Sequence, residues 1–147
     1  MLIHLNPEQE LHVDFTYQLL KERYKYAETI NIMGMSLPTL PTYKQHRNWL
    51  IENVKGDHYL YLDPHPIAMV SVRTDDSGEW KIENEVGIFV LESEWGKGYG
   101  GRALEAMFRL YPRHSFNAKI NPDNEQSKKM FAKIGFKHVA EIWRKDE

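Results

Sequence analysis

The sequence of 147 residues contains no cysteine. That absence excludes a disulfide scaffold, thiolate metal sites and a cysteine nucleophile, and it suits a reducing cytoplasm. No apolar run approaches the roughly 20 residues of a membrane-spanning helix. The first ten residues lack the basic region and the long apolar region of a secretory signal. We therefore expect a cytoplasmic protein that has no membrane partner.

The sequence also lacks a large excess of either charge, because its formal net charge is −2. It therefore gives no reason to expect a nucleic-acid partner. The distribution is uneven. Residues 97–137 contain nine Lys or Arg and three Asp or Glu, whereas residues 1–96 contain eight and fifteen. The later segment is equipped for an anion and the earlier one for a cationic partner, unless the charges are simply scattered over solvated faces.

The length fits one domain, 1–147, whose elements follow from apolar periodicity and turn residues. Helices are predicted for His12–Tyr24, from a Thr42 cap to about Val54, for Gly98–Tyr111 and for Asn124–Ile134. Strands are predicted for Leu2–Asn6, His58–Leu62, Ile67–Arg73, Glu85–Leu91, His114–Ile120 and Phe136–Arg144, with turns at Asp63–Pro66 and Asp75–Gly78 and a long loop at Thr29–Pro41. This order predicts an α/β fold, a mixed sheet with helices on both sides.

Glycines gather in the segment Trp95-Gly96-Lys97-Gly98-Tyr99-Gly100-Gly101, between a predicted strand and a predicted helix. Glycine lets backbone N–H groups approach a ligand closely and allows positive φ angles. The N-terminus of a helix adds oriented, unpaired donors, which together make an anion site. Lys97 and Arg102 add positive charge, so the segment indicates a phosphate or pyrophosphate ligand.

Three other interpretations of this loop are possible. Gly96, Gly98 and Gly101 satisfy G-x-G-x-x-G, and Asp123 follows about twenty residues later, as in a dinucleotide-binding fold. In that fold, however, the loop follows its strand directly and more chain comes after it. A P-loop would need a Lys-Ser/Thr pair after the glycines, and none is there. A tight strand-to-helix turn without a ligand remains the alternative.

The loop resembles the pyrophosphate loop of the GNAT acetyltransferases, Arg/Gln-x-x-G-x-G/A, with Trp95 at the usual Arg/Gln position. The W-G-K-G-Y segment and Glu85-Val86-Gly87 resemble the branch of ribosomal-protein alanine acetyltransferases. A second family motif, N-x-x-S/A followed by Gly-Phe, is matched by Asn124-Glu125-Gln126-Ser127 and then Gly135-Phe136. The two motifs occur in the family's order, and the resemblance covers nearly the whole chain.

The resemblance implies a mixed, mostly antiparallel sheet with splayed central strands, and acetyl-CoA as cosubstrate. Backbone groups of Phe89, Val90 and Leu91 would pair with the pantetheine arm, and Asn124 and Ser127 would contact it from the far side, although Asn124 could equally be a plain helix cap. The pyrophosphate would lie on the loop and helix start, at Trp95, Gly96, Lys97, Gly98, Tyr99, Gly100, Gly101 and Arg102. The partner would be a small-molecule or peptide amine, and the protein a monomer or a homodimer.

The implied chemistry is attack of a neutral amine on a thioester. A substrate ammonium has a pKa near ~10, so a base must remove its proton. The resemblance favours Glu85, acting through water, over the alternative of a surface carboxylate at a strand end. Phe131 stands where the family often has a thiol-protonating Tyr, and a phenyl ring has no such proton. Ser127, Tyr99 or water could act instead, or the thiolate could leave unassisted, and Phe131 is expected to be a core aromatic.

Histidines are frequent, yet His12, His46, His58, His65, His114 and His138 lack metal-ligand spacing, so no metal is predicted. His46 is predicted to contact the acceptor amine from the second helix, the alternative being an ordinary surface histidine. Two functions of different class follow. One is an enzyme that acetylates a primary amine (a small amine, an amino sugar or a protein N-terminus) through a ternary complex. The other is a catalytically weak CoA-binding module, favoured by Phe131.

Overall fold

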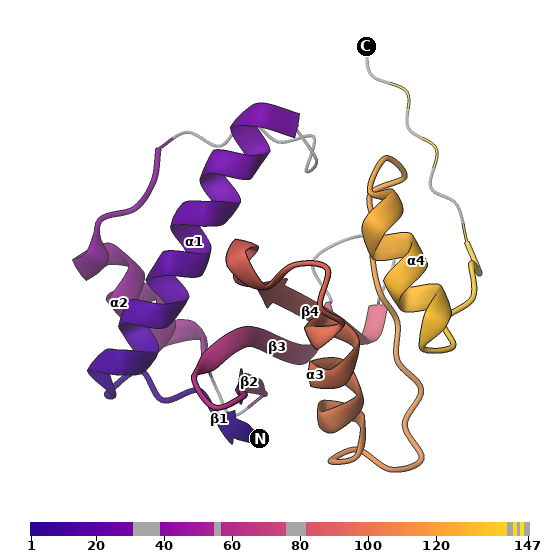
Figure 1. Ribbon diagram of the computed structural model, residues 1–147, viewed down its shortest axis with the longest axis horizontal. Coiled ribbons are helices and arrows are strands. Elements are labelled where there is room, and N and C mark those ends of the chain that lie inside the picture. Colours follow the sequence, from indigo (N-terminus) through magenta and orange to yellow (C-terminus); the bar gives the residue numbers. More distant parts are fainter. Residues whose placement is uncertain (31–38, 55–56, 76–81, 141–142, 144, 146–147) are drawn as a thin grey trace.

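The computed structural model describes residues 1–30, 39–54, 57–75, 82–140, 143 and 145. Four antiparallel strands form one sheet in the order β1-β2-β3-β4, namely β1 (Leu2–His4), β2 (His58–Leu62), β3 (Pro66–Asp75) and β4 (Ile82–Val90). One side of the sheet carries α1 (Glu10–Ile30) and α2 (Tyr43–Asn53), and the other carries α3 (Tyr99–Phe108) and α4 (Glu125–Lys133), as Figure 1 shows. A short 3-10 helix, η1 (Glu92–Glu94), links β4 to the glycine loop.

Alternation along the strands divides the apolar side chains between two cores. On β4, Val86, Ile88 and Val90 pack toward α3 and α4, whereas Phe89 packs toward α1 and α2, as does Leu91 just after the strand. We call these the α3–α4 face and the α1–α2 face of the sheet. Every second residue of β4 therefore belongs to the same face, which places Glu85 with Phe89 on the α1–α2 face.

The predicted second helix is confirmed, including its cap. The N–H of Gln45 donates to Thr42 Oγ1 at 3.2 Å, and the N–H of Thr42 donates to Gln45 Oε1 at 2.9 Å. This reciprocal capping box satisfies two backbone donors that a helix start otherwise leaves unpaired. The first helix is longer than predicted, because α1 continues through Thr29 and Ile30. The rest of the predicted loop falls mostly on residues 31–38, outside the described residues.

Two predicted strands are wrong in the part of the chain that the structure describes. Residues 114–120 make a single parallel bridge, between Asn117 and Glu85, and residues 136–140 and 143 form no strand. The alternating apolar pattern had another cause. Every second side chain of this stretch packs against the α3–α4 core, namely Phe116, Ala118 and Ile120, although the backbone forms no strand ladder. The predicted turn at Asp63–Pro66 does join β2 to β3, whereas most of the one after Asp75 falls outside the described residues.

Two features are absent from the described residues. No helix there is both long enough and apolar enough to span a bilayer. No group of three or more His, Cys, Asp or Glu side chains gathers there as the ligands of a metal ion would.

Candidate functional site

The junction between β4 and residues 114–117 is built from two asparagines. The N–H of Val86 donates to Asn117 O at 2.8 Å, and the N–H of Asn117 donates to Asn84 O at 3.0 Å. Their side chains add two bonds, from Asn117 Nδ2 to Glu83 O at 2.8 Å and from Asn84 Nδ2 to Ser115 O at 3.0 Å. Asn84 has φ of 50°, a left-handed conformation that asparagine tolerates better than most residues. Beyond this junction no strand of the described chain pairs with the outer edge of β4.

The outer edge of β4 is open at Ile88 and Val90. The N–H of Leu91 donates to Ile67 O on β3, and backbone groups alternate between the two sides of a strand, so Phe89 also faces β3. The indole N–H of Trp95 donates to Val90 O at 2.9 Å. The open edge therefore offers the N–H and C=O of Ile88 and the N–H of Val90. Of Phe89, Val90 and Leu91, which were predicted to pair with pantetheine, only Val90 presents its backbone at this edge. Ile88 was not among the predicted residues.

The glycine loop owes its shape to two left-handed residues. Gly96 has φ of 78° and Gly98 φ of 81°, and a Cβ added at either would meet nothing within 4 Å. These positions favour glycine for backbone conformation and not for space. Gly98 is the N-cap of α3 and supplies no side-chain cap to the first turn. The N–H groups of that turn have no intrahelical partner, so they are suited to an anion.

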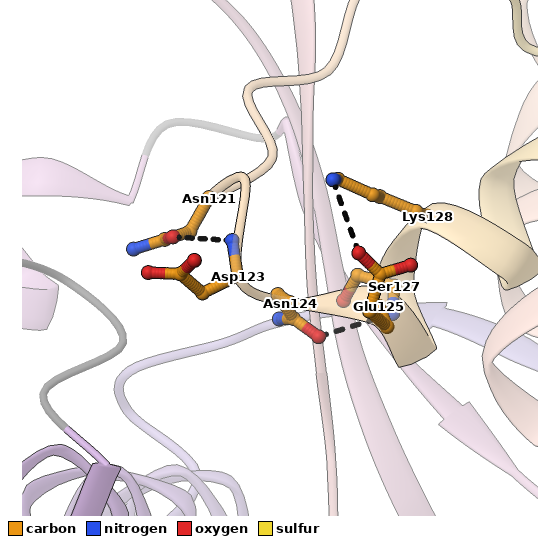
Figure 2. Close-up of polar contacts among 6 residues, drawn as sticks. All are labelled: Asn121, Asp123, Asn124, Glu125, Ser127 and Lys128. Atoms are coloured by element: carbon orange, nitrogen blue, oxygen red, sulfur yellow. Dashed lines mark hydrogen bonds and ion pairs between the residues drawn. The ribbon is translucent and has the colours of Figure 1, made fainter.

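A cavity of about 420 Å³ joins this loop to the open edge of β4. It brings together most of the predicted cofactor-binding residues: Phe89, Val90, Trp95, Gly96, Gly98, Tyr99, Gly100, Gly101, Asn124 and Ser127. Asn124 caps α4, since the N–H of Ser127 donates to Asn124 Oδ1 at 3.1 Å (Figure 2). Asn124 thus caps the helix and lines the cavity as well.

Three of the predicted cofactor-binding residues do not line this cavity. Lys97 Nζ pairs with Glu94 Oε2 at 3.0 Å on the surface. The Arg102 guanidinium lies over the Tyr99 ring, 5.4 Å from its centroid, and lines a separate cavity between β1 and α3. Leu91 packs toward the α1–α2 core. The positive charge expected from Lys97 and Arg102 is therefore not in the cavity wall.

Helix α1 contributes a wall that the sequence analysis did not predict. Leu19, Glu22 and Arg23 line the cavity from one helical face, with i, i+3 and i+4 spacing that could have indicated a shared surface. The Arg23 guanidinium lies 4.9 Å from the centroid of the Phe89 ring, and burial lowers the pKa of Arg23. Both Glu22 carboxylate oxygens lie 3.3 Å from the N–H of Glu92, which donates to them. Within the described chain, Arg23 is the only Lys or Arg in this wall.

Glu85 lies on β4 just after the asparagine junction, outside the residues that line the cavity. Its side chain is 13% exposed, and Oε2 is buried without a hydrogen-bond partner among the described residues. Lys119 Nζ forms an ion pair with Glu85 and lies 3.9 Å from Oε2. An unpaired buried acceptor costs free energy, so this oxygen is suited to a water or a ligand donor.

His46 lies between α1 and α2 and does not line the cavity. It is 6% exposed, with Nε2 at 2.9 Å from Thr16 Oγ1. The Thr16 hydroxyl also has a backbone acceptor in His12 O at 2.9 Å, and the tautomer of His46 decides which of Thr16 Oγ1 and His46 Nε2 donates to the other. Burial lowers the pKa of His46. The alternative that His46 is an ordinary surface histidine is therefore wrong. The predicted contact of His46 with the acceptor amine stays a prediction, and this buried position does not favour it.

Phe131 is a core aromatic, as predicted. It is 5% exposed and meets Phe136 edge-on, with ring centroids 5.0 Å apart. The side chain belongs to the α3–α4 core together with Leu104 and Met107 of α3. Its position on α4 is therefore explained by packing.

Comparison with known proteins gives two kinds of match. The family model described as "Acetyltransferase (GNAT) domain" matches residues 5–137, whereas no curated protein gives a significant match. A ribosomal-protein-alanine N-acetyltransferase from Brucella melitensis has a TM-score of 0.68 at 16% identity, covering 95% of this chain and 86% of that one. An aminoglycoside 6'-N-acetyltransferase from Acinetobacter haemolyticus has 0.58 at 17%, covering 99% and 98%. AAC(6')-Iy in complex with a CoA bisubstrate analogue has 0.63 at 19%, covering 100% and 97%.

Proposed function

The chain belongs to the GNAT acetyltransferases, and from that premise we propose that it transfers an acetyl group from acetyl-CoA to a primary amine. The observation that carries the proposal is one cavity that joins the open edge of β4 to the uncapped first turn of α3. A strand edge suits the amides of a pantetheine arm, and a helix N-terminus suits a pyrophosphate. A ligand such as acetyl-CoA carries both pantetheine amides and a pyrophosphate, so it would use both the strand edge and the helix N-terminus.

The residues present fit acetyl-CoA. The N–H and C=O of Ile88 and the N–H of Val90 would hold the pantetheine arm, with Asn124 and Ser127 on the opposite wall. The N–H groups of Tyr99, Gly100 and Gly101 would hold the pyrophosphate, because no side chain caps that turn. Bound acetyl-CoA supplies an activated acetyl thioester. The protein's task is then to bring an amine to it and to move protons.

Glu85 is proposed to remove the proton of the acceptor ammonium, directly or through a water. Its buried Oε2 has no hydrogen-bond partner in the described chain, so it can accept from a ligand donor. A positioned base contributes about 10²–10⁴-fold to a proton-transfer step. Backbone N–H groups at the open edge of β4 are the proposed donors to the oxyanion that develops as the amine attacks.

The departing sulfur must also gain a proton. Phe131 cannot donate one and lies in the core. Tyr99 and Ser127 both line the cavity and both carry hydroxyl groups. We propose that one of them, or water, donates this proton.

The acceptor is proposed to be a cationic amine in a ternary complex: a small amine, an amino sugar or a protein N-terminus. Glu22 and Glu94 line the cavity, and Glu85 lies on β4, the strand whose later residues line it, so carboxylates would concentrate an ammonium. Two structural neighbours carry names of enzymes that acetylate amines, ribosomal-protein alanine and aminoglycosides. We further propose a cytoplasmic monomer or homodimer that has no nucleic-acid partner.

The alternative is a module that binds CoA with little turnover, and Phe131 is the observation that favours it. Incubation with acetyl-CoA and a pool of primary amines separates the two, with free thiol followed over time and acetyl-CoA binding measured by calorimetry. Amine-dependent thiol release supports the enzyme. Binding without thiol release would support the module, and absence of binding would overturn both.

A further inference from the structure

Lys119 brings a primary amine to the carboxylate proposed as the base. Its Nζ lies 3.9 Å from Glu85 Oε2, and the lysine side chain is 53% exposed. Lys119 follows the Asn117 junction by two residues, at the point where pairing with β4 stops. The amine therefore lies where the open edge of β4 begins.

This ion pair differs from two others made by lysines. Lys97–Glu94 and Lys128–Glu125 join residues three apart, at 3.0 Å and 3.3 Å. The pair of Lys119 and Glu85 joins two segments far apart in sequence, and at 3.9 Å it is longer than a hydrogen bond. Glu85 Oε2 keeps its hydrogen-bonding capacity although it is buried beside an ammonium.

We propose that Lys119 is an internal acceptor, so that the protein acetylates its own lysine; the proposal rests on the proposed acetyltransferase function. The Lys119 ammonium gives one proton to the Glu85 carboxylate and becomes a neutral amine. Nζ then attacks the thioester carbonyl carbon, a C–N bond forms, and the C–S bond breaks with its electron pair on sulfur. The second nitrogen proton passes to the sulfur, directly or through water. The products are an acetamide on Lys119 and free CoA, and Glu85 returns its proton to solvent.

Acetylation of Lys119 would also change the electrostatic charge of the site. An acetamide carries no charge, so Glu85 would lose the cation of this ion pair. An arriving acceptor ammonium would then meet a carboxylate without a competing amine. Self-acetylation of Lys119 would therefore alter how strongly the site attracts cationic acceptors.

The test is the initial rate of acetylation at single lysines, followed by peptide mass spectrometry after addition of acetyl-CoA. Lys128 is the matched control, because it is 43% exposed and also pairs with a glutamate, Glu125 (Figure 2). Direct chemical acetylation should affect Lys119 and Lys128 alike. We expect Lys119 to react about 10²-fold faster, the lower end of what a positioned base contributes. Glu85→Gln should bring it close to the rate of Lys128, and Lys119→Arg should leave Lys128 unchanged.

Two additions keep this test separate from that of the proposed function. A pool of primary amines in a parallel reaction reports transfer to external acceptors. Equal rates at Lys119 and Lys128 while the pool is acetylated would overturn the internal acceptor and leave the acetyltransferase standing. No acetylation of the pool or of Lys119 above a heat-unfolded control would overturn both. A Lys119 rate constant that rises with protein concentration would show transfer between copies and would overturn the internal route.

Discussion

At the scale of single residues, Glu85 offers the sharpest test of the chemistry. Glu85→Gln keeps size and shape but cannot take a proton, so we expect kcat/KM for the external amine to fall by about 10²–10⁴-fold. Acetyl-CoA affinity should be unchanged, because Glu85 is outside the cavity wall. The rise of rate with pH should also weaken. Steady-state kinetics across pH, together with calorimetry, would measure both effects.

The matched control is Glu83→Gln, two residues earlier on the same strand, where the side chain is exposed. It should retain the kinetics of the unsubstituted protein. Unchanged kinetics in the Glu85 variant would remove the base assignment and leave bulk water as the proton acceptor.

The burial of His46 leads to a prediction about how the stability of the fold depends on pH. Burial lowers its pKa in the folded state, whereas the unfolded chain takes up the proton near pH 6.5. Above that pH both states are neutral and this histidine leaves stability unchanged. As pH falls below about 6.5, the unfolded state binds a proton that the folded state does not, so stability falls until the folded pKa is reached. The loss should be visible as a lower melting temperature at acid pH.

The comparison is with His46→Gln, whose amide can still form a hydrogen bond with Thr16 and does not titrate. His12 also has a lowered pKa and acts in the same direction, so both proteins should lose stability in acid. The unsubstituted protein should lose more. Melting curves that shift equally in the two proteins between pH 7.5 and pH 5.5 would contradict this role of His46.

At the scale of elements, the N-terminus of α3 is the proposed pyrophosphate site, and Gly98 is the place to test it. A Cβ at Gly98 would meet no atom within 4 Å, so the strain of a substitution there comes from the positive φ and not from crowding of that atom. Aspartate and asparagine share shape and tolerance of positive φ but differ by one charge. Gly98→Asp should abolish CoA binding, whereas Gly98→Asn should weaken it far less. Calorimetry that shows equal affinities in the two variants would place the pyrophosphate elsewhere.

The junction of β4 with residues 114–117 should set the position of Glu85. Asn117→Ala removes the side-chain bond to Glu83 O and keeps the backbone bonds to Asn84 and Val86. One such hydrogen bond is worth about 0.5–1.5 kcal/mol of stability. We expect a loss of that size in chemical unfolding and a lower kcat with unchanged CoA affinity, because the junction lies beside Glu85 and away from the glycine loop. An unchanged kcat would show that the backbone bonds suffice.

Local signals made some elements predictable. The cap at Thr42 acts within four residues, so the sequence around α2 was enough to predict it, whereas the reciprocal bond from Gln45 was seen only in the structure. The stretch around Phe116, Ala118 and Ile120 was not predictable in this way, because a strand depends on a partner edge as well as on alternation. The glycine loop could be predicted, since positive φ restricts the residue type. The wall from α1 could not, because it requires knowing which helix packs over β4.

At the scale of the whole molecule, the sheet separates two helical pairs, and the candidate site draws on both. The α1–α2 face carries Glu85, Phe89 and the side chain of Arg23, whereas α3 and α4 supply the anion site and the opposite wall. The open edge of β4 joins the two sides (Figure 1). A thioester held at that edge would be reachable by an amine from the α1–α2 face. In the proposed function, α3 and α4 would hold the pyrophosphate and pantetheine, and the amine would arrive from the α1–α2 face, whose helix α1 also lines the cavity.

The most direct test of that account is the initial rate of free-thiol release from saturating acetyl-CoA, with and without a pool of primary amines. The unsubstituted protein should release thiol faster with the amines. Gly98→Asp should release none above background, because the cosubstrate is not held, and Glu85→Gln should be slowed by about 10²–10⁴-fold. Thiol release that is the same with and without amines, and the same in all three proteins, would contradict the account.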